Sequence, residues 1–396
     1  MNEAVIVAGV RTAIGRVGGT LKDVEADYLA AQVIKEAIAR SGIPDTSIDE
    51  VIFGHTKQSG DNPNLARLAW LRANMSEAVP AYTVHRQCGS ALTAVNDAVQ
   101  SIWAGTQEIV MAGGAESMST APYYLRHARY GFRMGNAEIL DSNTESQPRC
   151  QPQERYGYLN MGLTAENLAE KYKISRQEQD EFALISQERA LRALKEGLFK
   201  AEIVPYEVKG KRESVIFAAD EHPRETSLAQ LAKLPAVFKE GGTVTAGNSS
   251  GRNDAAAVLI LTTAAKAKEY GLKPLVRVLG IGAKGVPPQI MGIGPVPASA
   301  AALRMAGLTL EQIDLIELNE AFAAQSLAVI KELGLDIART NVNGGAIALG
   351  HPLGATGAII LIKLINELKR TGKRYGLATM CIGGGQGIST IVENLN

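Results

Sequence analysis

The sequence predicts an α/β protein made of two copies of one β/α domain, with a polar segment inserted between them. Four blocks of the N-terminal third recur in the same order near the C-terminus, and their offsets drift by only a few residues. Charge is also uneven, because residues 119–250 carry 36 charged residues in 132 positions and the other 264 positions carry 46. Each half is predicted to be a mixed sheet covered by helices.

The longest repeat pairs residues 37–53 with residues 302–318. Each copy reads as a helix that ends near a glycine, Gly42 or Gly307, followed by a short loop, Ile-Asp and a strand. The alternative is that unrelated β/α units share this rhythm. The other repeated pairs are 5–11 with 276–282, 84–95 with 348–359 and 109–116 with 378–385.

These patterns set the predicted boundaries. Residues 1–118 form the first half. Residues 251–270, approximately, complete it, because AAAVLILTT (255–263) reads as a buried strand. Residues 119–250 form the inserted loop domain, in which Glu178–Glu196 has helical spacing, and 271–396 form the second half.

Composition excludes several classes of protein. The 396 residues carry 41 basic and 41 acidic side chains, so a nucleic acid or an anionic membrane surface is not an expected partner. Three cysteines, none spaced like zinc ligands, indicate neither a disulfide framework nor a metal site. The apolar start lacks a signal peptide's basic region and cleavage site. No stretch resembles a membrane span, so we expect a cytoplasmic protein.

The first candidate nucleophile is Cys88, which follows a strand-like run and opens an apolar helix. A helix N-terminus lowers a thiol pKa and favours the thiolate. His351 holds the matching helix start in the second half, where an imidazole could take the thiol proton. The alternative is that Cys88 is a small buried core residue.

Two further polar groups follow predicted strands of the second half. Cys381 ends the last strand-like run, and the glycines from Gly383 onward could direct backbone N–H groups at an anion or form only a tight turn. Asn319 and Glu320 lie where a strand turns into a helix, either as an ordinary cap or as site residues.

A different class is suggested by GNSSG (247–251), which matches the nucleophile elbow of serine hydrolases with Ser249 as nucleophile. The elbow needs a strand before the serine and a helix after it. Here the preceding run is short and a strand-like run follows, which argues against this alternative.

Taken together, the motifs resemble those of the thiolase family over essentially the full chain. The resemblance implies a five-layer α-β-α-β-α core with a loop domain and a homo-oligomer, a tetramer in preference to a dimer. It implies an acyltransferase of fatty acid metabolism that cleaves 3-ketoacyl-CoA with CoA, or condenses two acyl-CoA molecules, with no permanently bound cofactor. The motifs are HRQCGSALTA (85–94), MAGGAESMS (111–119), MGLTAENLAEKY (161–172), VTAGNSSGRND (244–254), LNEAFAAQ (318–325), NGGAIALGHPLGATGA (343–358) and MCIGGGQG (380–387).

The resemblance also implies residue roles. Cys88 would be acylated, and His351 would activate it and, with Asn319 through a water, bind one thioester oxygen. Cys381 would move the proton at the α-carbon. Backbone N–H groups of Cys88 and Gly383 would form a second oxyanion hole, since charge develops on two carbonyls.

The remaining residues that the resemblance implies orient a catalytic group or contact the substrate. Glu320 would orient Asn319 or its water, and Arg224 and Ser250 would contact CoA. Three further positions match the pantetheine and acyl channel, with core packing as the alternative: Met161, Phe238 and Met291. The sequence around Asn160 differs from the usual sequence of the family, so two substrate classes stay open. We expect a short-chain 3-ketoacyl-CoA, and the alternative is a longer or branched one.

Overall fold

The fold is organised around one large mixed sheet. The computed structural model describes residues 2–210 and 213–396, and its main strands run in the order β13-β14-β15-β12-β1-β11-β5-β3-β4. The short strands β2 and β8 pair with β11 and β1. The strands are β1 (Ala4–Thr12), β2 (Gly15–Arg16), β3 (Glu50–Gly54), β4 (Ala81–Val84), β5 (Ile109–Ser117), β8 (Ile203–Val204), β11 (Asn253–Thr263), β12 (Val276–Gly285), β13 (Leu315–Leu318), β14 (Tyr375–Ile382) and β15 (Gln386–Asn394).

Strand order confirms the predicted duplication. The first half runs β1-β11-β5-β3 and the second runs β12-β15-β14-β13, so the three repeated blocks that contain these strands occupy the same place in each half. The halves meet where β1 pairs with β12 antiparallel over only two residue pairs, Val5 with Arg277 and Ile6 with Val276. All eleven residues of β11 are buried, as the apolar run predicts.

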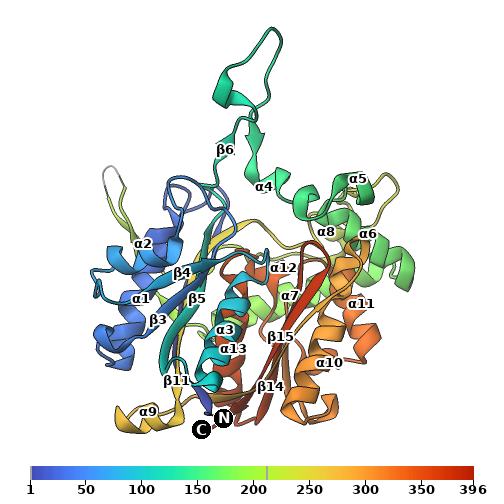
Figure 1. Cartoon of the computed structure of the whole chain (residues 1–396). Coiled ribbons are helices and arrows are strands. Elements are labelled where there is room, and N and C mark those ends of the chain that lie inside the picture. Colours follow the sequence, from blue (N-terminus) through green and yellow to red (C-terminus); the bar gives the residue numbers. More distant parts are fainter. Residues whose placement is uncertain (1, 211–212) are drawn as a thin grey trace.

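Helices complete five layers, as expected from the family resemblance. Helices α3 (Ser90–Ala104) and α13 (Thr356–Thr371) lie between the two halves of the sheet and contact each other. Both are buried along most of their length, as helices with apolar residues on nearly all sides must be. On the outer sides, α1 (Ala26–Ser41) packs on the first half and α10 (Pro295–Ala306) on the second (Figure 1).

The predicted helix ends are confirmed. Gly42 and Gly307 have φ of 69° and 66°, and each ends its helix in the left-handed conformation that glycine adopts most easily. Each is followed by a 3-10 turn and a strand, so the chain enters β3 and β13 in the same way.

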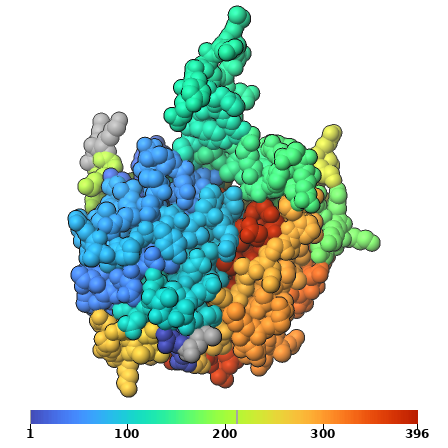
Figure 2. Space-filling view, viewed as in Figure 1, coloured from blue at the N-terminus to red at the C-terminus, as the bar shows by residue number. Residues whose placement is uncertain are grey.

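The insert forms small elements across one end of the molecule. Its longest helix, predicted over Glu178–Glu196, is α7 (Arg176–Lys195), which begins at a capping box between Ser175 and Glu178. A projecting hairpin carries β6 and β7 (Figures 1 and 2). The domain boundaries stay a prediction. The insert's elements are β6 (Tyr123–Tyr124), β7 (Leu140–Asp141), α4 (Ser142–Glu145), α5 (Gln153–Tyr156), α6 (Met161–Tyr172), α7, β8, β9 (Tyr206–Val208), β10 (Val215–Phe217) and α8 (Leu228–Leu231).

The remaining helices have between four and eleven residues each. They are α2 (Leu65–Arg72), α9 (Ala264–Glu269), α11 (Ala323–Leu333) and α12 (Ala346–Leu349). Within residues 2–210 and 213–396, none of the helices combines the length and the apolar character needed to cross a membrane.

Close approach of the two halves makes Gly114 a sensitive position. A Cβ there would lie 2.0 Å from the Gly354 carbonyl oxygen and 2.8 Å from that of Gly54. A backbone carbonyl can move only together with the chain segment around it. We therefore expect Gly114→Ala to lower the free energy of unfolding by about 3 kcal/mol or more. Chemical denaturation measures this, with Gly60→Ala as control because its Cβ would meet no atom within 4 Å. Equal stability of the two variants would contradict the expected clash.

Candidate active site

The Cys88 thiol sits at a sharp turn between β4 and α3. Gln87 has φ of 46°, an uncommon left-handed conformation for a non-glycine residue. The Ser90 hydroxyl fixes this turn, since it accepts a hydrogen bond from the Arg86 N–H at 2.9 Å and donates to the Gln87 carbonyl at 2.6 Å. Gly89 caps the helix at a place where a Cβ would lie 2.4 Å from Ile382. The predicted helix start at Cys88 is confirmed.

The expected lowering of the Cys88 pKa is wrong. Burial raises the pKa of this thiol, and it outweighs the lowering by backbone N–H groups of Gly383 and Cys88 and by the charge of Lys57. Desolvation disfavours the thiolate more than the helix start favours it. Cys88 therefore needs a base to become a nucleophile.

The position of His351 differs from the prediction. It does not begin a helix but lies in the loop between α12 and α13, five residues before Thr356, the first residue of α13. The repeat is out of register here because the second half has an extra loop. The backbone N–H of His351 donates to Asn253 Oδ1 at 2.9 Å, and its Nδ1 lies 2.7 Å from Thr356 Oγ1.

These contacts determine which ring nitrogen is free. The Thr356 hydroxyl donates its one proton to the Pro352 carbonyl at 2.9 Å, so His351 Nδ1 must donate to Thr356. Nε2 then keeps a lone pair, toward which Asn319 Nδ2 donates at 3.4 Å. Burial lowers the pKa of His351 from 6.5 to about 4. His351 is thus arranged as a neutral base.

This pKa shift predicts a loss of stability in acid. A histidine that is harder to protonate when folded binds fewer protons than in the unfolded chain, so stability is complete above pH 6.5 and falls as the pH drops toward 4. We expect unfolding free energy to fall between pH 7 and pH 4.5 by about 2–3 kcal/mol more in the wild type than in His351→Asn. Parallel pH profiles of the two proteins would contradict the shift.

Cys381 is the last residue but one of β14 and is fully buried. Contrary to the prediction, it does not end the last strand, because β15 follows β14. Burial raises its pKa far above the ordinary value, and the nearby Cys88 thiol raises it further. The group is therefore a protonated thiol at neutral pH. It packs in an apolar cluster with Met291 and Phe322, both of which line the adjoining pocket.

Asn319 follows β13 and is held by a hydrogen bond from its N–H to the Thr379 carbonyl at 3.0 Å. Its Oδ1 is buried, and no described residue offers it a hydrogen-bond partner. A buried amide oxygen of this kind is usually satisfied by water. The Asn319–His351 pair can therefore hold a water at the site.

Glu320 does not touch the Asn319 side chain among the described contacts. Its carboxylate accepts hydrogen bonds from Ser186 Oγ at 2.6 Å, Asn341 Nδ2 at 2.8 Å and the Ile347 N–H at 3.2 Å. Asn341 in turn bonds both backbone groups of Leu318. Glu320 therefore stabilises the segment that carries Asn319 through its hydrogen bond to Asn341.

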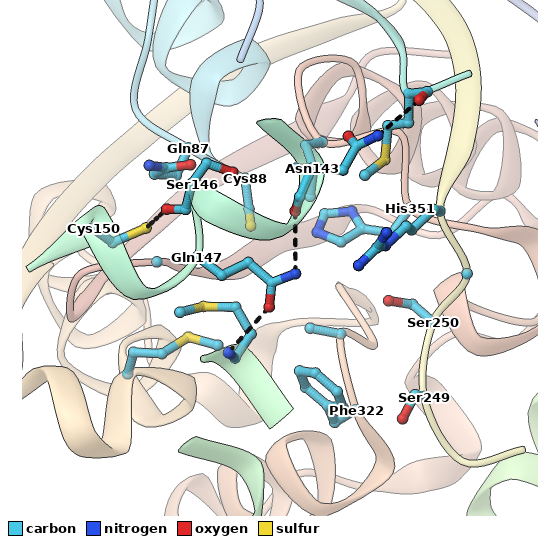
Figure 3. Close-up of a pocket in the computed structure, with 18 of the residues that line it drawn as sticks. Gln87, Cys88, Asn143, Ser146, Gln147, Cys150, Ser249, Ser250, Phe322 and His351 are labelled. Atoms are coloured by element: carbon cyan, nitrogen blue, oxygen red, sulfur yellow. Dashed lines mark hydrogen bonds between the residues drawn. The ribbon is translucent and has the colours of Figure 1, made fainter. Parts of the chain in front are cut away.

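One pocket joins the two halves and the insert (Figure 3). Arg224 is not among its lining residues; its N–H donates to Gln187 Oε1 at 3.0 Å instead. Asn319, Glu320 and Cys381 likewise lie behind the lining. The residues expected from the sequence that line it are Cys88, His351, Gly383, Ser250, Met161, Phe238 and Met291.

Sequence reasoning missed one wall of this pocket. The wall comes from the insert and from Gln87, and its only signal in the sequence was the departure from the family pattern around Asn160. The third cysteine, Cys150, lies here and donates from Sγ to the Ser146 carbonyl at 3.1 Å. Burial raises the pKa of Cys150 to about 12. The missed residues are Gln87, Asn143, Ser146, Gln147 and Cys150.

Ser249 lacks the geometry of a hydrolase nucleophile. Its hydroxyl donates to the Thr245 carbonyl at 2.6 Å, and the segment after it is strand β11 rather than a helix. Likewise, the described residues contain no group of three or more His, Cys, Asp or Glu side chains that could hold a metal ion.

Comparisons with known proteins give one consistent family. Residues 4–265 match the model described as "Thiolase, N-terminal domain" and residues 272–394 match "Thiolase, C-terminal domain". The chain is 48% identical to an acetyl-CoA acetyltransferase of Syntrophomonas wolfei and 49% identical to the beta-ketothiolase BktB of Cupriavidus necator, each over 99% of both chains. The crystal structure of the Bacillus anthracis acetyl-CoA acetyltransferase superposes with a TM-score of 0.97 at 47% identity, covering 100% of this chain and 99% of the other.

Proposed function

The chain belongs to the thiolase family, and from that premise we propose how its residues divide the reaction. It is an acyltransferase that cleaves 3-ketoacyl-CoA with CoA, or runs the reverse Claisen condensation, through an acyl-cysteine. The observation that carries the assignment of roles is the placement of His351 and Cys88 on one pocket, with the Nδ1 of His351 bound to Thr356 and its Nε2 unprotonated (Figure 3).

In the first half-reaction His351 Nε2 takes the proton of the Cys88 thiol. The thiolate attacks the 3-keto carbon, and the resulting oxyanion is stabilised by backbone N–H groups of Cys88 and Gly383. The bond between C2 and C3 then breaks. Its electron pair forms an enolate whose oxygen faces His351 and the Asn319-held water, and Cys381 protonates C2 to release acetyl-CoA.

In the second half-reaction Cys381, now a thiolate, takes the proton of the incoming CoA thiol. The CoA sulfur attacks the acyl-cysteine and the bond to Cys88 breaks. The released Cys88 thiolate takes its proton back from His351, and the shortened acyl-CoA leaves. Proton transfer by one thiol and acyl transfer by another explains why both lie at one site. No resident cofactor takes part, since CoA and acyl-CoA are the substrates.

The substrate preference follows from the same pocket. Met161, Phe238 and Met291 line its apolar side, with Phe238 and Phe322 in edge-to-face contact at 6.0 Å. We expect a short-chain 3-ketoacyl-CoA, with acetoacetyl-CoA the first substrate to test. Longer and methyl-branched 3-ketoacyl-CoA whose chains end in a methyl group should have a lower kcat/KM. A higher kcat/KM for the longer or branched compounds would favour the alternative substrate class.

CoA would enter along Ser250, which lines the pocket, and Arg224 would reach only the distal part of CoA. A homo-tetramer is proposed because the β6–β7 hairpin projects from the body and exposes Tyr130 and Met134 almost completely. Large apolar side chains exposed together mark an association surface. The cytoplasm is the proposed location.

A further inference from the structure

One wall of the pocket is mostly polar, and its Gln147 Oε1 accepts a hydrogen bond from the Met161 N–H at 3.3 Å. The wall is built by α4, by the 3-10 turn Pro148–Cys150 and by the turn before Cys88. An unsubstituted short acyl chain gains nothing from polar neighbours, because desolvating them has a cost that no contact of the chain repays. The wall residues are Gln87, Asn143, Ser146, Gln147 and Cys150 (Figure 3).

Behind this wall lies a buried ammonium group. Lys57 is only 5% exposed, and its Nζ donates to Ser146 Oγ at 2.8 Å and to the Ser142 carbonyl at 3.3 Å. Because an ammonium has donors and no acceptor, the Ser146 hydroxyl proton must point away from Lys57. Ser146 itself lines the pocket, so this proton, polarised by the charge behind it, is available to an acceptor there.

Each carboxylate that acts on Lys57 from close by also binds other groups. Glu116 is fully buried, and its carboxylate lies 3.0 Å from His55 Nδ1, whose pKa it raises. The same carboxylate is held by the Thr56 hydroxyl and the Gly354 N–H. Asp141 also acts on Lys57, but its oxygens cap α4. One buried carboxylate is thus shared by two basic groups.

From this arrangement we propose that the Ser146–Lys57 pair is a subsite for the far end of the acyl chain, and that it selects 3-ketoacyl-CoA substrates ending in a carboxylate. The proposal rests on the proposed function, since it assigns substrate to the same pocket. The carboxylate would accept the Ser146 hydroxyl proton and lie in the field of Lys57. Such charge-assisted hydrogen bonds are stronger than neutral ones.

The test compares two six-carbon 3-ketoacyl-CoA substrates that differ only at the last carbon, one a carboxylate and the other a methyl group. We expect the wild type to have a kcat/KM at least tenfold higher for the carboxylate. Lys57→Met and Ser146→Ala should each remove most of this preference, and in Ser146→Ala kcat/KM for acetoacetyl-CoA should stay within about threefold of the wild type. Ser142→Ala is the matched control, because Ser142 begins the short helix that Ser146 caps at its C-terminus and does not line the pocket.

The outcomes separate the subsite from the proposed function. Cleavage of acetoacetyl-CoA with no preference between the six-carbon substrates overturns the subsite alone. So does a loss that is equal for all substrates in Ser146→Ala, or a wild type that cleaves neither six-carbon compound. If Lys57→Met fails to fold, Ser146→Ala decides by itself. Activity that survives removal of the Cys88 thiol would instead overturn the proposed function.

Discussion

Cys88→Ala should abolish acyl transfer, with thiolysis of acetoacetyl-CoA falling by about 10⁴-fold or more. The expected size reflects the loss of the covalent step, since alanine cannot carry the acyl group. The fold should be retained, because the thiol is small and an alanine fills most of its space. Thiolysis is measured by the loss of acetoacetyl-CoA, and the acyl-enzyme is sought by mass spectrometry after mixing with acetyl-CoA.

A matched control exists in the same pocket. Cys150 also lines it, but its thiol donates to the Ser146 carbonyl and lies on the insert rather than at a helix start. Cys150→Ala should keep thiolysis within a few-fold of the wild type and keep the acetyl mass increment. If Cys150→Ala lost activity and Cys88→Ala kept it, the assignment of the nucleophile would be wrong.

Cys381→Ala should lower thiolysis by about 10³-fold or more while leaving Cys88 able to react. The high pKa of the buried Cys381 thiol means that it holds a proton at neutral pH, which the departing C2 carbanion requires. Without it, no other described thiol lies at that place. The measurement pairs the thiolysis rate with exchange of the acetyl-CoA methyl protons for deuterium.

The two half-reactions distinguish this role from a structural one. In Cys381→Ala, alkylation of Cys88 by iodoacetamide should proceed at a rate near that of the wild type, because His351 and its partner Thr356 are untouched. Methyl-proton exchange should disappear. Loss of alkylation together with exchange would mean that the substitution disturbs the whole pocket and that Cys381 has no separate role in proton transfer.

Much of the fold could be predicted from local pattern. Gly42 and Gly307 end equivalent helices because the left-handed cap needs glycine wherever the helix lies. The repeated blocks predicted a duplicated core, and strand order confirms it. The helix start at Cys88 was also local information, since it depends on a strand, a glycine and an apolar periodicity that are adjacent in sequence.

Residues separated by a loop insertion were harder to place. His351 was expected at a helix start because its block aligns with that of Cys88, yet the structure puts it in a loop. Its tautomer depends on Thr356 and Pro352, and its low pKa depends on burial in the folded chain. Alignment of repeats carries neither kind of information.

The sequence by itself determined the repeat, the ends of the helices and the identity of the reactive side chains, because these depend on neighbours along the chain. Only the tertiary structure decided the electrostatics of the site. Burial reversed the expected pKa shift of Cys88, and packing placed Ser146 against Lys57, 89 residues away in sequence. Desolvation and charge pairing act between groups close in space, so their sign is set only once the chain has folded.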